Sequence, residues 1–178
     1  MTTLIPHDGR NVVDHFKYWN TEAINAILQC NSHSFSVAME HWVSDLNIGS
    51  MIRNANAFLA REVHYIGKRQ WDRRGAVGTH HYVRLIHHWS VQEFVLRARL
   101  NGYQIICVDN VAAAKPIEST PLPKMSLFVF GTEALGISQE LLYHADDIVY
   151  IKQYGSVRSL NASVASGIVM YEWIKQHT

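Results

Sequence analysis

Two short, mostly apolar runs, each ending at a polar or small residue, constrain the fold of this chain more than any other feature. Residues 103–108 stop at Asp109, and residues 127–130 stop at Gly131 and Thr132. Short runs without regular polar alternation are typical of strands that are buried on both faces of a parallel sheet. We therefore expect both runs to be strands of such a sheet.

The rest of the pattern alternates short apolar runs with helical segments. We expect strands at residues 36–39, 63–66, 82–86, 103–108, 127–130 and 147–151, and helices at residues 48–59, 91–100 and 161–176. Ser90 is the expected N-cap of the helix at 91–100. Residues 111–124, with three of the four prolines, are expected to form a loop. This alternation predicts an α/β fold with a mostly parallel sheet covered by helices on both faces.

The composition fits one folded domain with a short extension. A chain of 178 residues, 48% of them apolar, can bury a sizeable core. Residues 1–34 are polar and mixed, and we expect an N-terminal extension with one short helix that Thr21 caps. Residues 35–178 are expected to form the domain. The formal net charge of +1 does not identify a partner, because a nucleic-acid-binding protein can gather its basic residues on one face.

Several classes of site and location are not expected. Cys30 and Cys107 cannot form a disulfide framework, and the apolar run around Cys107 predicts a buried thiol. The histidine pairs 80–81 and 87–88 lack the spacing and the cysteine partners of a zinc site, so we assign no metal. The sequence has no charged leader before a cleavable apolar segment and no apolar run long enough to span a bilayer. We expect a cytoplasmic protein without a membrane partner.

The carboxyl ends of the expected strands predict where a ligand binds. Ligands of open α/β sheets lie beyond these ends, which here are residues 109–110, 131–133 and 152–155. Gly131 directly follows a strand, so an adenine or a ribose can lie against its backbone without meeting a Cβ atom. Gly136 and Gly155 can do the same, or they can close turns. We expect the three segments to line one crevice.

Polar residues near the starts of two helices have two possible uses. Asn47 and Ser159 each stand just before an expected helix and can act as its N-cap. Asn161 stands inside the expected first turn of the last helix, where an asparagine gains nothing by itself. We therefore expect Asn161 to hold a ligand or a neighbouring loop.

Three blocks of sequence carry a resemblance that covers roughly residues 35–175. They are residues 47–55 (NIGSMIRNA), 130–136 (FGTEALG) and 155–165 (GSVRSLNASVA). Their order and spacing resemble the SpoU (TrmH-like) branch of the SPOUT RNA methyltransferases. The resemblance implies an α/β domain whose C-terminal part is tied into a deep trefoil knot, which is a rare topology. It also implies an S-adenosylmethionine-dependent enzyme that methylates a ribose 2′-hydroxyl of RNA.

The resemblance assigns residues to a cofactor pocket and to catalysis. The main chain at Gly131, Ile151 and Leu160 is expected to hold S-adenosylmethionine, and Val108 borders the same pocket. Ile151 and Leu160 can be core residues at the same time, because the expected contact is through the main chain. The residues that the resemblance assigns to catalysis are Asn47, Arg53, Glu133, Ser159 and Asn161.

Arg53 is the most important single side chain in this assignment. A guanidinium stays protonated in proteins, so it is a poor general base. Its fork of donors suits the phosphate next to the target ribose, and a phosphate oxygen or solvent can then receive the hydroxyl proton. Glu133 resembles an orienting residue that accepts hydrogen bonds from Arg53 or Asn47; without the resemblance it is a solvated glutamate.

The implied reaction is displacement at the sulfonium methyl group by a ribose 2′-hydroxyl. Charge on the sulfur disperses in the transition state, so neither a metal nor an oxyanion hole is required. Catalysis then depends mostly on holding the hydroxyl in line with the methyl–sulfur bond, and the 2′-hydroxyl explains an RNA substrate.

A basic run interleaved with Trp71 is either a solvated loop or a surface that follows RNA phosphates. The expected RNA-binding residues are Lys68, Arg69, Arg73 and Arg74 of this run, with Arg53 and Arg158.

The chain departs from the family pattern at two places. Lys152 and Gln153 stand where the family usually has a proline and a methionine, and Ala162 replaces a common valine. Small residues along the last helix permit close packing, and the family uses this helix in a homodimer, which we expect here.

The substrate and one rival function stay open. A tRNA is favoured and an rRNA comes next. Several rRNA enzymes of the family carry a separate RNA-binding domain at the N-terminus, and residues 1–34 are too short for one. The rival function is a non-catalytic RNA-binding subunit that keeps the knotted fold, and the intact set of expected catalytic residues speaks against it. A nucleotide-binding oxidoreductase is disfavoured, since no G-x-G-x-x-G turn follows the first strand.

Overall fold

The computed structural model describes residues 8–41, 47–132 and 135–178. Within these residues the strands form a seven-stranded sheet of order β3-β2-β1-β6-β4-β7-β5, in which every pairing is parallel. The strands are β1 Ser36–His41, β2 Val63–Gly67, β3 Leu85–His88, β4 Gln104–Val108, β5 Lys115–Pro116, β6 Ser126–Phe130 and β7 Asp147–Tyr150. The helices are α1 Thr21–Cys30, α2 Asn47–Ala57, α3 Val91–Leu100, α4 Gln139–Tyr143 and α5 Ala162–His177. Short 3-10 helices are η1 Asp14–Phe16, η2 Arg73–Ala76, η3 Thr79–Tyr82 and η4 Ile117–Ser119.

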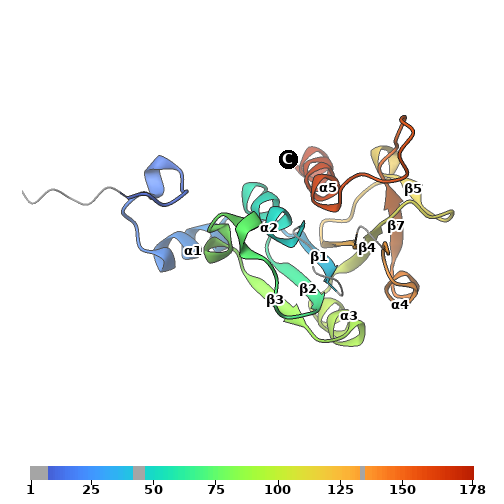
Figure 1. Ribbon diagram of the computed structural model, residues 1–178, viewed down its shortest axis with the longest axis horizontal. Coiled ribbons are helices and arrows are strands. Elements are labelled where there is room, and N and C mark those ends of the chain that lie inside the picture. The colour runs from blue at the N-terminus through green and yellow to red at the C-terminus, as the bar shows by residue number, and fades with distance from the viewer. Residues whose placement is uncertain (1–7, 42–46, 133–134) are drawn as a thin grey trace, which may run out of the picture.

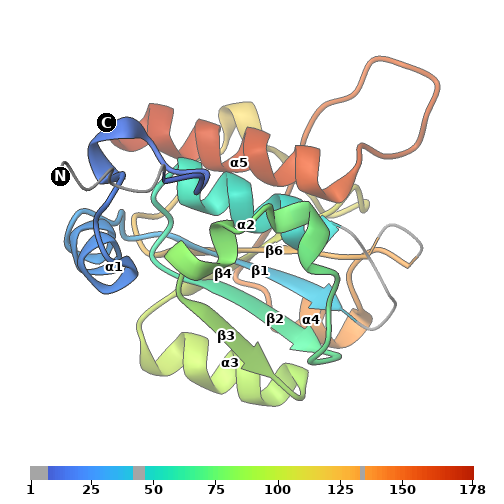
Figure 2. The same cartoon turned by 60° about the vertical axis from the view of Figure 1, so that its left-hand side comes forward.

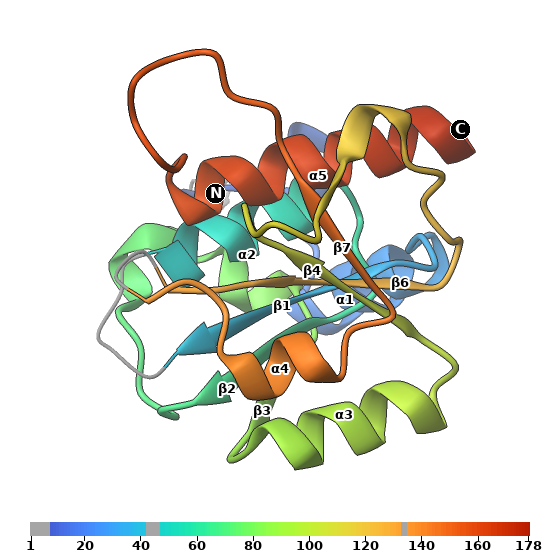
Figure 3. The ribbon, with the colours of Figure 1, turned by 90° about the vertical axis from the view of Figure 1, so that its right-hand side faces the viewer.

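Helices cover both faces of the sheet, with α2 and α5 on one face and α3 and α4 on the other (Figure 3). Successive side chains of a strand point to opposite faces. On β6, Phe128 and Phe130 pack into the core under α2 and α5, whereas Leu127 and Val129 pack into the core under α3 and α4. Every residue of β6 is buried, which explains why this strand has no polar alternation.

The expected α/β class is confirmed, while some element bounds differ. The third strand is expected at residues 82–86 but lies at Leu85–His88, because η3 occupies Thr79–Tyr82. The expected loop at 111–124 contains the edge strand β5, which pairs with β7, and also η4. The short helix α4 has no counterpart among the expected elements. The trefoil knot stays a prediction that rests on the resemblance.

Two helix starts test the expected caps. Ser90 caps α3 as expected, since its hydroxyl accepts a hydrogen bond from the backbone N–H of Glu93 at 3.2 Å. The expected cap of α1 is wrong by one residue. Asn20, not Thr21, accepts from the backbone N–H of Ala23 at 2.7 Å. Asparagine is as good an N-cap as threonine or better, so the chemistry is as expected although the position is not.

The C-terminal half of α5 is anchored in the core. Trp173 is buried, its ring centroid lies 4.6 Å from that of Phe35, and its indole N–H donates to the carbonyl of Pro123 at 2.9 Å. The other end of α5 lies at the carboxyl edge of the sheet, and the loop between β7 and α5 projects from the body there (Figure 2). The described part of the N-terminal extension, with α1, lies at the opposite end of the molecule (Figure 1). The fold therefore separates the extension from the carboxyl ends of β4, β6 and β7.

Candidate functional site

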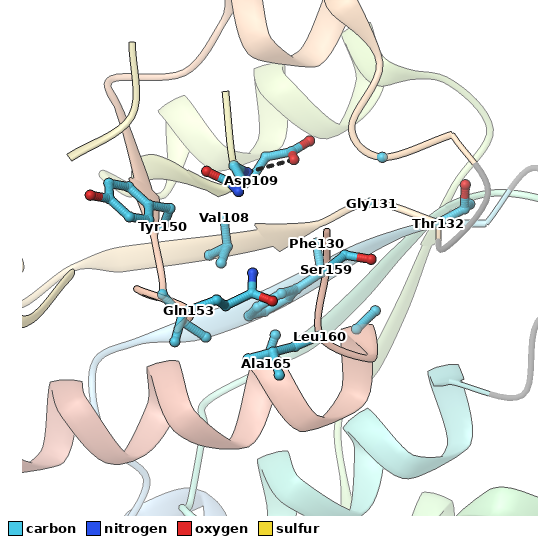
Figure 4. A pocket seen from close by; sticks show the side chains of 14 residues that line it. Val108, Asp109, Phe130, Gly131, Thr132, Tyr150, Gln153, Ser159, Leu160 and Ala165 are labelled. Atoms are coloured by element: carbon cyan, nitrogen blue, oxygen red, sulfur yellow. Dashed lines mark hydrogen bonds between the residues drawn. The ribbon is translucent and has the colours of Figure 1, made fainter. Parts of the chain in front are cut away.

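A pocket opens beyond the carboxyl ends of β4, β6 and β7, beside the first turn of α5 (Figure 4). Its volume is about 220 Å³. The lining combines apolar side chains with a few polar groups, as small-molecule sites do. The lining residues are Val108, Asp109, Asn110, Phe130, Gly131, Thr132, Gly136, Tyr150, Ile151, Gln153, Ser159, Leu160, Ala162 and Ala165.

The four residues expected to hold a cofactor all line this pocket. Val108 ends β4, Gly131 follows β6, Ile151 follows β7, and Leu160 lies just before α5. The chain brings them together because parallel strands end at the same edge of a sheet. From the expected crevice segments, Asp109, Asn110, Gly131, Thr132 and Gln153 also line the pocket, whereas Lys152, Tyr154 and Gly155 do not.

The reason for a glycine at position 131 differs from the expected one. A Cβ atom at Gly131 would lie 2.0 Å from the carbonyl carbon of Gly136, so the space beside Gly131 is filled by the chain itself. Thr132 and Gly136 exchange two backbone hydrogen bonds, at 2.9 and 3.1 Å, that close this turn. Gly136 has a φ of +66°, in the left-handed region that favours glycine. Both glycines thus shape the pocket wall, and Gly131 does not leave an open space for a ligand.

Asp109 fixes the same turn from the neighbouring strand. Its Oδ1 accepts from the backbone N–H of Asn110 at 2.7 Å, and its Oδ2 accepts from the backbone N–H of Ile137 at 3.1 Å. Both carboxylate oxygens are therefore engaged by main-chain donors. This arrangement joins the ends of β4 and β6 into one rigid wall.

Asn161 is the N-cap of α5, and it also contacts α2. Its Oδ1 accepts from the backbone N–H groups of Ser163 and Val164, at 3.0 and 3.1 Å. Its Nδ2 donates to Oδ1 of Asn47, the first residue of α2, at 2.8 Å. The expected cap Ser159 is wrong, and so is the expectation that Asn161 lies inside the helix, because α5 begins at Ala162. The segment that Asn161 holds is the start of α2.

A second asparagine joins the two helices beside Arg53. Nδ2 of Asn54 donates to the carbonyl oxygen of Ser163 at 2.7 Å and to Oγ of Ser166 at 3.1 Å. Arg53 itself is exposed, does not line the pocket, and has no hydrogen bond or ion pair with any residue that the structure describes. Its guanidinium is thus available to a ligand on a helix whose position is fixed against α5. Glu133, the expected orienting residue, lies outside the described residues.

The expected basic run follows β2 and is partly neutralised. Lys68, Arg69 and Arg73 are exposed. Arg74 pairs with Asp72, with 2.5 Å between Nη2 and Oδ2. The run is attached to α2, because a Cβ atom at Gly49 would lie 2.7 Å from the backbone nitrogen of Ala76 in η2. Three of the four expected RNA-binding residues of this run are therefore exposed cations that follow β2, and η2, which begins at Arg73, packs beside α2.

The aromatic residue of this run, Trp71, is not free to stack on a base. Trp71 is half-buried and packs against the core, so its ring is not an open stacking platform between the basic residues. Burial raises the pKa of Tyr65, and the nearby guanidinium groups of Arg69 and Arg73 oppose that shift. Arg158 is exposed in the projecting loop between β7 and α5.

Some pocket residues were missed by reasoning from the sequence. Ala162 and Ala165 lie one turn apart on α5, and their small side chains leave room for the pocket. Their i, i+3 spacing was the available signal. Tyr150 ends β7 and gave no signal of its own. Gln153 belongs to the expected crevice segment 152–155 and lines the pocket, but nothing in the sequence indicated that its side chain is the one that turns inward.

The remaining chemistry of the described residues is limited. Cys107 is buried as expected, and burial raises the pKa of its thiol to about 12, so it stays protonated at neutral pH and is a poor nucleophile. In the described part of the chain, no group of three or more His, Cys, Asp or Glu residues is placed to hold a metal ion. No helix among these residues is both long and apolar enough to cross a membrane.

Comparison with known sequences points to one family. The SpoU rRNA Methylase family matches residues 34–171. The tRNA (guanosine(18)-2′-O)-methyltransferase of Escherichia coli K12 is 31% identical over 147 residues, which is 79% of this chain and 63% of that protein. This chain therefore spans about 63% of the length of that relative.

Solved structures share the fold. The SpoU methyltransferase AviRb from Streptomyces viridochromogenes, in complex with the cofactor AdoMet, has a TM-score of 0.70 at 25% identity, over 81% of this chain and 61% of that chain. The A. aeolicus TrmH/SpoU tRNA modifying enzyme has a TM-score of 0.76 at 24% identity, over 88% of this chain and 81% of that chain.

Proposed function

Because this chain belongs to the SpoU rRNA Methylase family, we propose that it transfers a methyl group from S-adenosylmethionine (AdoMet) to a ribose 2′-hydroxyl of RNA. One observation carries the proposal. Val108, Gly131, Ile151 and Leu160, which the resemblance assigns to the cofactor, line a single pocket at the carboxyl edge of the sheet. An AdoMet complex of the similar AviRb methyltransferase supports the choice of cofactor.

The lining of the pocket suits the chemistry of AdoMet. Val108, Phe130 and Leu160 offer apolar side chains to an adenine, and the ends of β4, β6 and β7 offer main-chain donors and acceptors. AdoMet supplies a methyl group on a positively charged sulfur. The protein then needs no metal to activate the methyl group, and its task is to hold the ribose hydroxyl in line with it.

Arg53 and the contacts of the two asparagines have separate roles: Arg53 binds the RNA, and the contacts hold α2 in place. We propose that the exposed guanidinium of Arg53 binds the phosphate beside the target ribose, because a fork of donors matches phosphate geometry. The Asn47–Asn161 hydrogen bond holds the start of α2 against the start of α5. That contact fixes the helix that carries Arg53 relative to the pocket. We propose that a phosphate oxygen or solvent receives the hydroxyl proton, and that Ser159, which lines the pocket, contacts the reacting groups.

We propose tRNA as the substrate, with rRNA next. The E. coli relative is named for guanosine 18 of tRNA, and the chain belongs to a family named for rRNA. Lys68, Arg69 and Arg73 would follow the RNA backbone. They come after β2, which lies two strands from β6, or roughly 10 Å at the usual strand spacing of about 4.8 Å. That separation is within reach of a nucleotide or two of RNA.

Assembly and domain boundaries are part of the same proposal. We take residues 35–178 as the knotted methyltransferase domain and residues 1–34 as an extension of a cytoplasmic protein. Val164, Ile168 and Tyr171 are exposed at 53%, 38% and 57%. Their spacing places these apolar side chains on one stripe of α5. A second copy of this chain that covers the stripe would form the expected homodimer.

The test is transfer of a radiolabelled methyl group from AdoMet to separate pools of tRNA and rRNA, followed by digestion to nucleosides. Label in 2′-O-methylribose from the tRNA pool is the expected result. Label on a base would contradict the proposed reaction, and label only in rRNA would correct the substrate. AdoMet binding without transfer to either pool would favour the non-catalytic RNA-binding subunit.

A further inference from the structure

The side chain of Gln153 points into the pocket, although it follows the end of β7 in an otherwise exposed loop. Its neighbours Lys152 and Tyr154 are exposed, and Nζ of Lys152 lies 5.4 Å from the centroid of the Tyr154 ring. Figure 4 shows the amide of Gln153 lying inside the pocket, between Val108 and Leu160. The loop therefore turns one of three consecutive polar side chains inward.

The amide oxygen of Gln153 is buried and has no hydrogen-bond donor among the described residues. A buried acceptor without a partner is unfavourable, and proteins rarely keep one. Solvent lies close by, as the exposure of Lys152 and Tyr154 demonstrates. A glutamine that stays inside under these conditions is placed to receive a donor from a bound ligand.

The carboxylate of the pocket is already in use. Both carboxylate oxygens of Asp109 accept backbone hydrogen bonds, from Asn110 and Ile137. Gln153 thus differs from Asp109, because its acceptor is left for a ligand. The side chains beside the amide, Val108 and Leu160, are apolar and suit a flat aromatic group.

A primary amide has a donor and an acceptor side by side in one plane, as has the edge of an adenine. Glutamine binds adenine through this pair, with the amide oxygen accepting from the 6-amino group and the amide nitrogen donating to the adjacent ring nitrogen. We propose that Gln153 is a specificity-determining residue that reads the 6-amino group of the AdoMet adenine. This inference rests on the proposed function, and it assigns a role to a residue where the family usually has methionine.

The test compares two ligands by titration calorimetry on the purified protein. One is S-adenosylhomocysteine, and the other is its analogue with hydrogen in place of the 6-amino group. One good bidentate pair is worth a discrimination of about 1–3 kcal/mol, or roughly 5- to 150-fold. The wild-type protein should prefer the amino compound by a factor in that range. Gln153→Met should bring this preference close to 1 while keeping most of the affinity for the analogue.

Two further variants keep the test decisive. Lys152→Met changes the exposed neighbour in the same way and should leave the preference unchanged. Gln153→Asn keeps the amide but withdraws it by one methylene, so it should behave like Gln153→Met. It replaces Gln153→Met if that variant does not give a cooperative thermal melt. Equal affinity of the wild type for both ligands, or an undiminished preference in Gln153→Met and Gln153→Asn, would overturn the inference and leave the proposed function standing. Failure of the wild type to bind either ligand would instead overturn the cofactor assignment on which the inference depends.

Discussion

The two faces of the sheet use polar side chains for different purposes. Under α2 and α5, Asn161 and Asn54 join helix to helix at the carboxyl edge, beside the pocket. Under α3, His64 and His88 lie within the core, with 2.9 Å between Nδ1 and Nε2, and both rings pack edge-on against Phe94. Among the described residues, the pocket lining takes none from α3 or α4.

This difference separates the polar groups that position the pocket from those that are enclosed in the core. An amide at a helix end sets the position of that end relative to its neighbour, so the polar contacts of the α2–α5 face determine the geometry of the pocket. The histidines of the α3 face are enclosed and reach no part of the pocket. We therefore propose that catalysis and cofactor binding depend on the α2–α5 face, and that the α3 face serves stability.

The largest expected difference between the two faces is in the activity of two matched arginine variants. Arg53→Ala on α2 should lower methyl transfer to RNA by about 100- to 1000-fold, the usual loss when one preorganised contact to a charged group is removed. Arg99→Ala on α3 removes an exposed ion pair with Asp146, so it should cost less than about 1 kcal/mol of stability and no activity. Initial rates and thermal melts of both variants are the measurement. Equal activity of the two variants would refute the functional division between the faces.

Exposed apolar residues on the two faces provide the second comparison. Ile168→Asp places a charge in the proposed dimer interface on α5, and we expect the dissociation constant of the dimer to rise about tenfold or more. Leu96, exposed at 62% on α3, is the matched control, and Leu96→Asp should leave the assembly state unchanged. Sedimentation velocity over a concentration series distinguishes these outcomes. A monomeric wild-type protein would contradict the proposed dimer, and a dimer that Leu96→Asp alone disrupts would place the interface elsewhere.

The histidines of the α3 face predict how stability depends on pH. Burial lowers the pKa of His64 and lowers that of His88 from 6.5 to about 4. Below pH 6.5 the unfolded chain therefore binds more protons than the folded one, and stability falls as the pH falls. We expect the free energy of unfolding to decrease by about 1–2 kcal/mol between pH 7 and pH 5.

Urea unfolding at several pH values measures this slope. His88→Phe keeps an aromatic ring and should flatten the slope, whereas His81→Phe, at an exposed position in η3, should not. A slope that His88→Phe leaves unchanged would mean that other groups cause the pH dependence.

The two helix caps give the smallest and most selective comparison. Asn161→Ala and Ser90→Ala each remove an N-cap, so each should cost about 1 kcal/mol of stability. Only Asn161→Ala should also lower methyl transfer, because it breaks the contact with Asn47. Asn161→Asp keeps the cap but loses the donor to Asn47, so it should retain the stability and still lose activity. Activity in Asn161→Asp equal to that of the wild type would mean that the Asn47 contact is only structural.

Much of the fold was predictable because its signals are local. The buried strand β6 and the capped helix α3 are visible as an apolar run and as a serine before a periodic segment. The grouping of Val108, Gly131 and Ile151 was also predictable, since the carboxyl ends of parallel strands share one edge.

Contacts between distant segments were not predictable in this way. Asn161 and Asn47 are separated by 114 positions, and no local pattern reveals that their amides meet. The inward orientation of Gln153 likewise depends on how the loop after β7 packs over the pocket. The reason for Gly131 was misjudged although Gly136 is near in the sequence, because no local pattern shows that the turn brings the two backbones together.

The most direct test of the division between the faces is a titration of ¹⁵N-labelled protein with S-adenosylhomocysteine, followed by amide NMR spectra. The account predicts that the largest shift changes fall on the amides of Val108, Gly131, Ile151 and Leu160 and on the first turn of α5, while the amides of α3 stay in place. Shift changes centred on α3, or none at saturating ligand, would contradict the assignment of the cofactor pocket to the carboxyl edge.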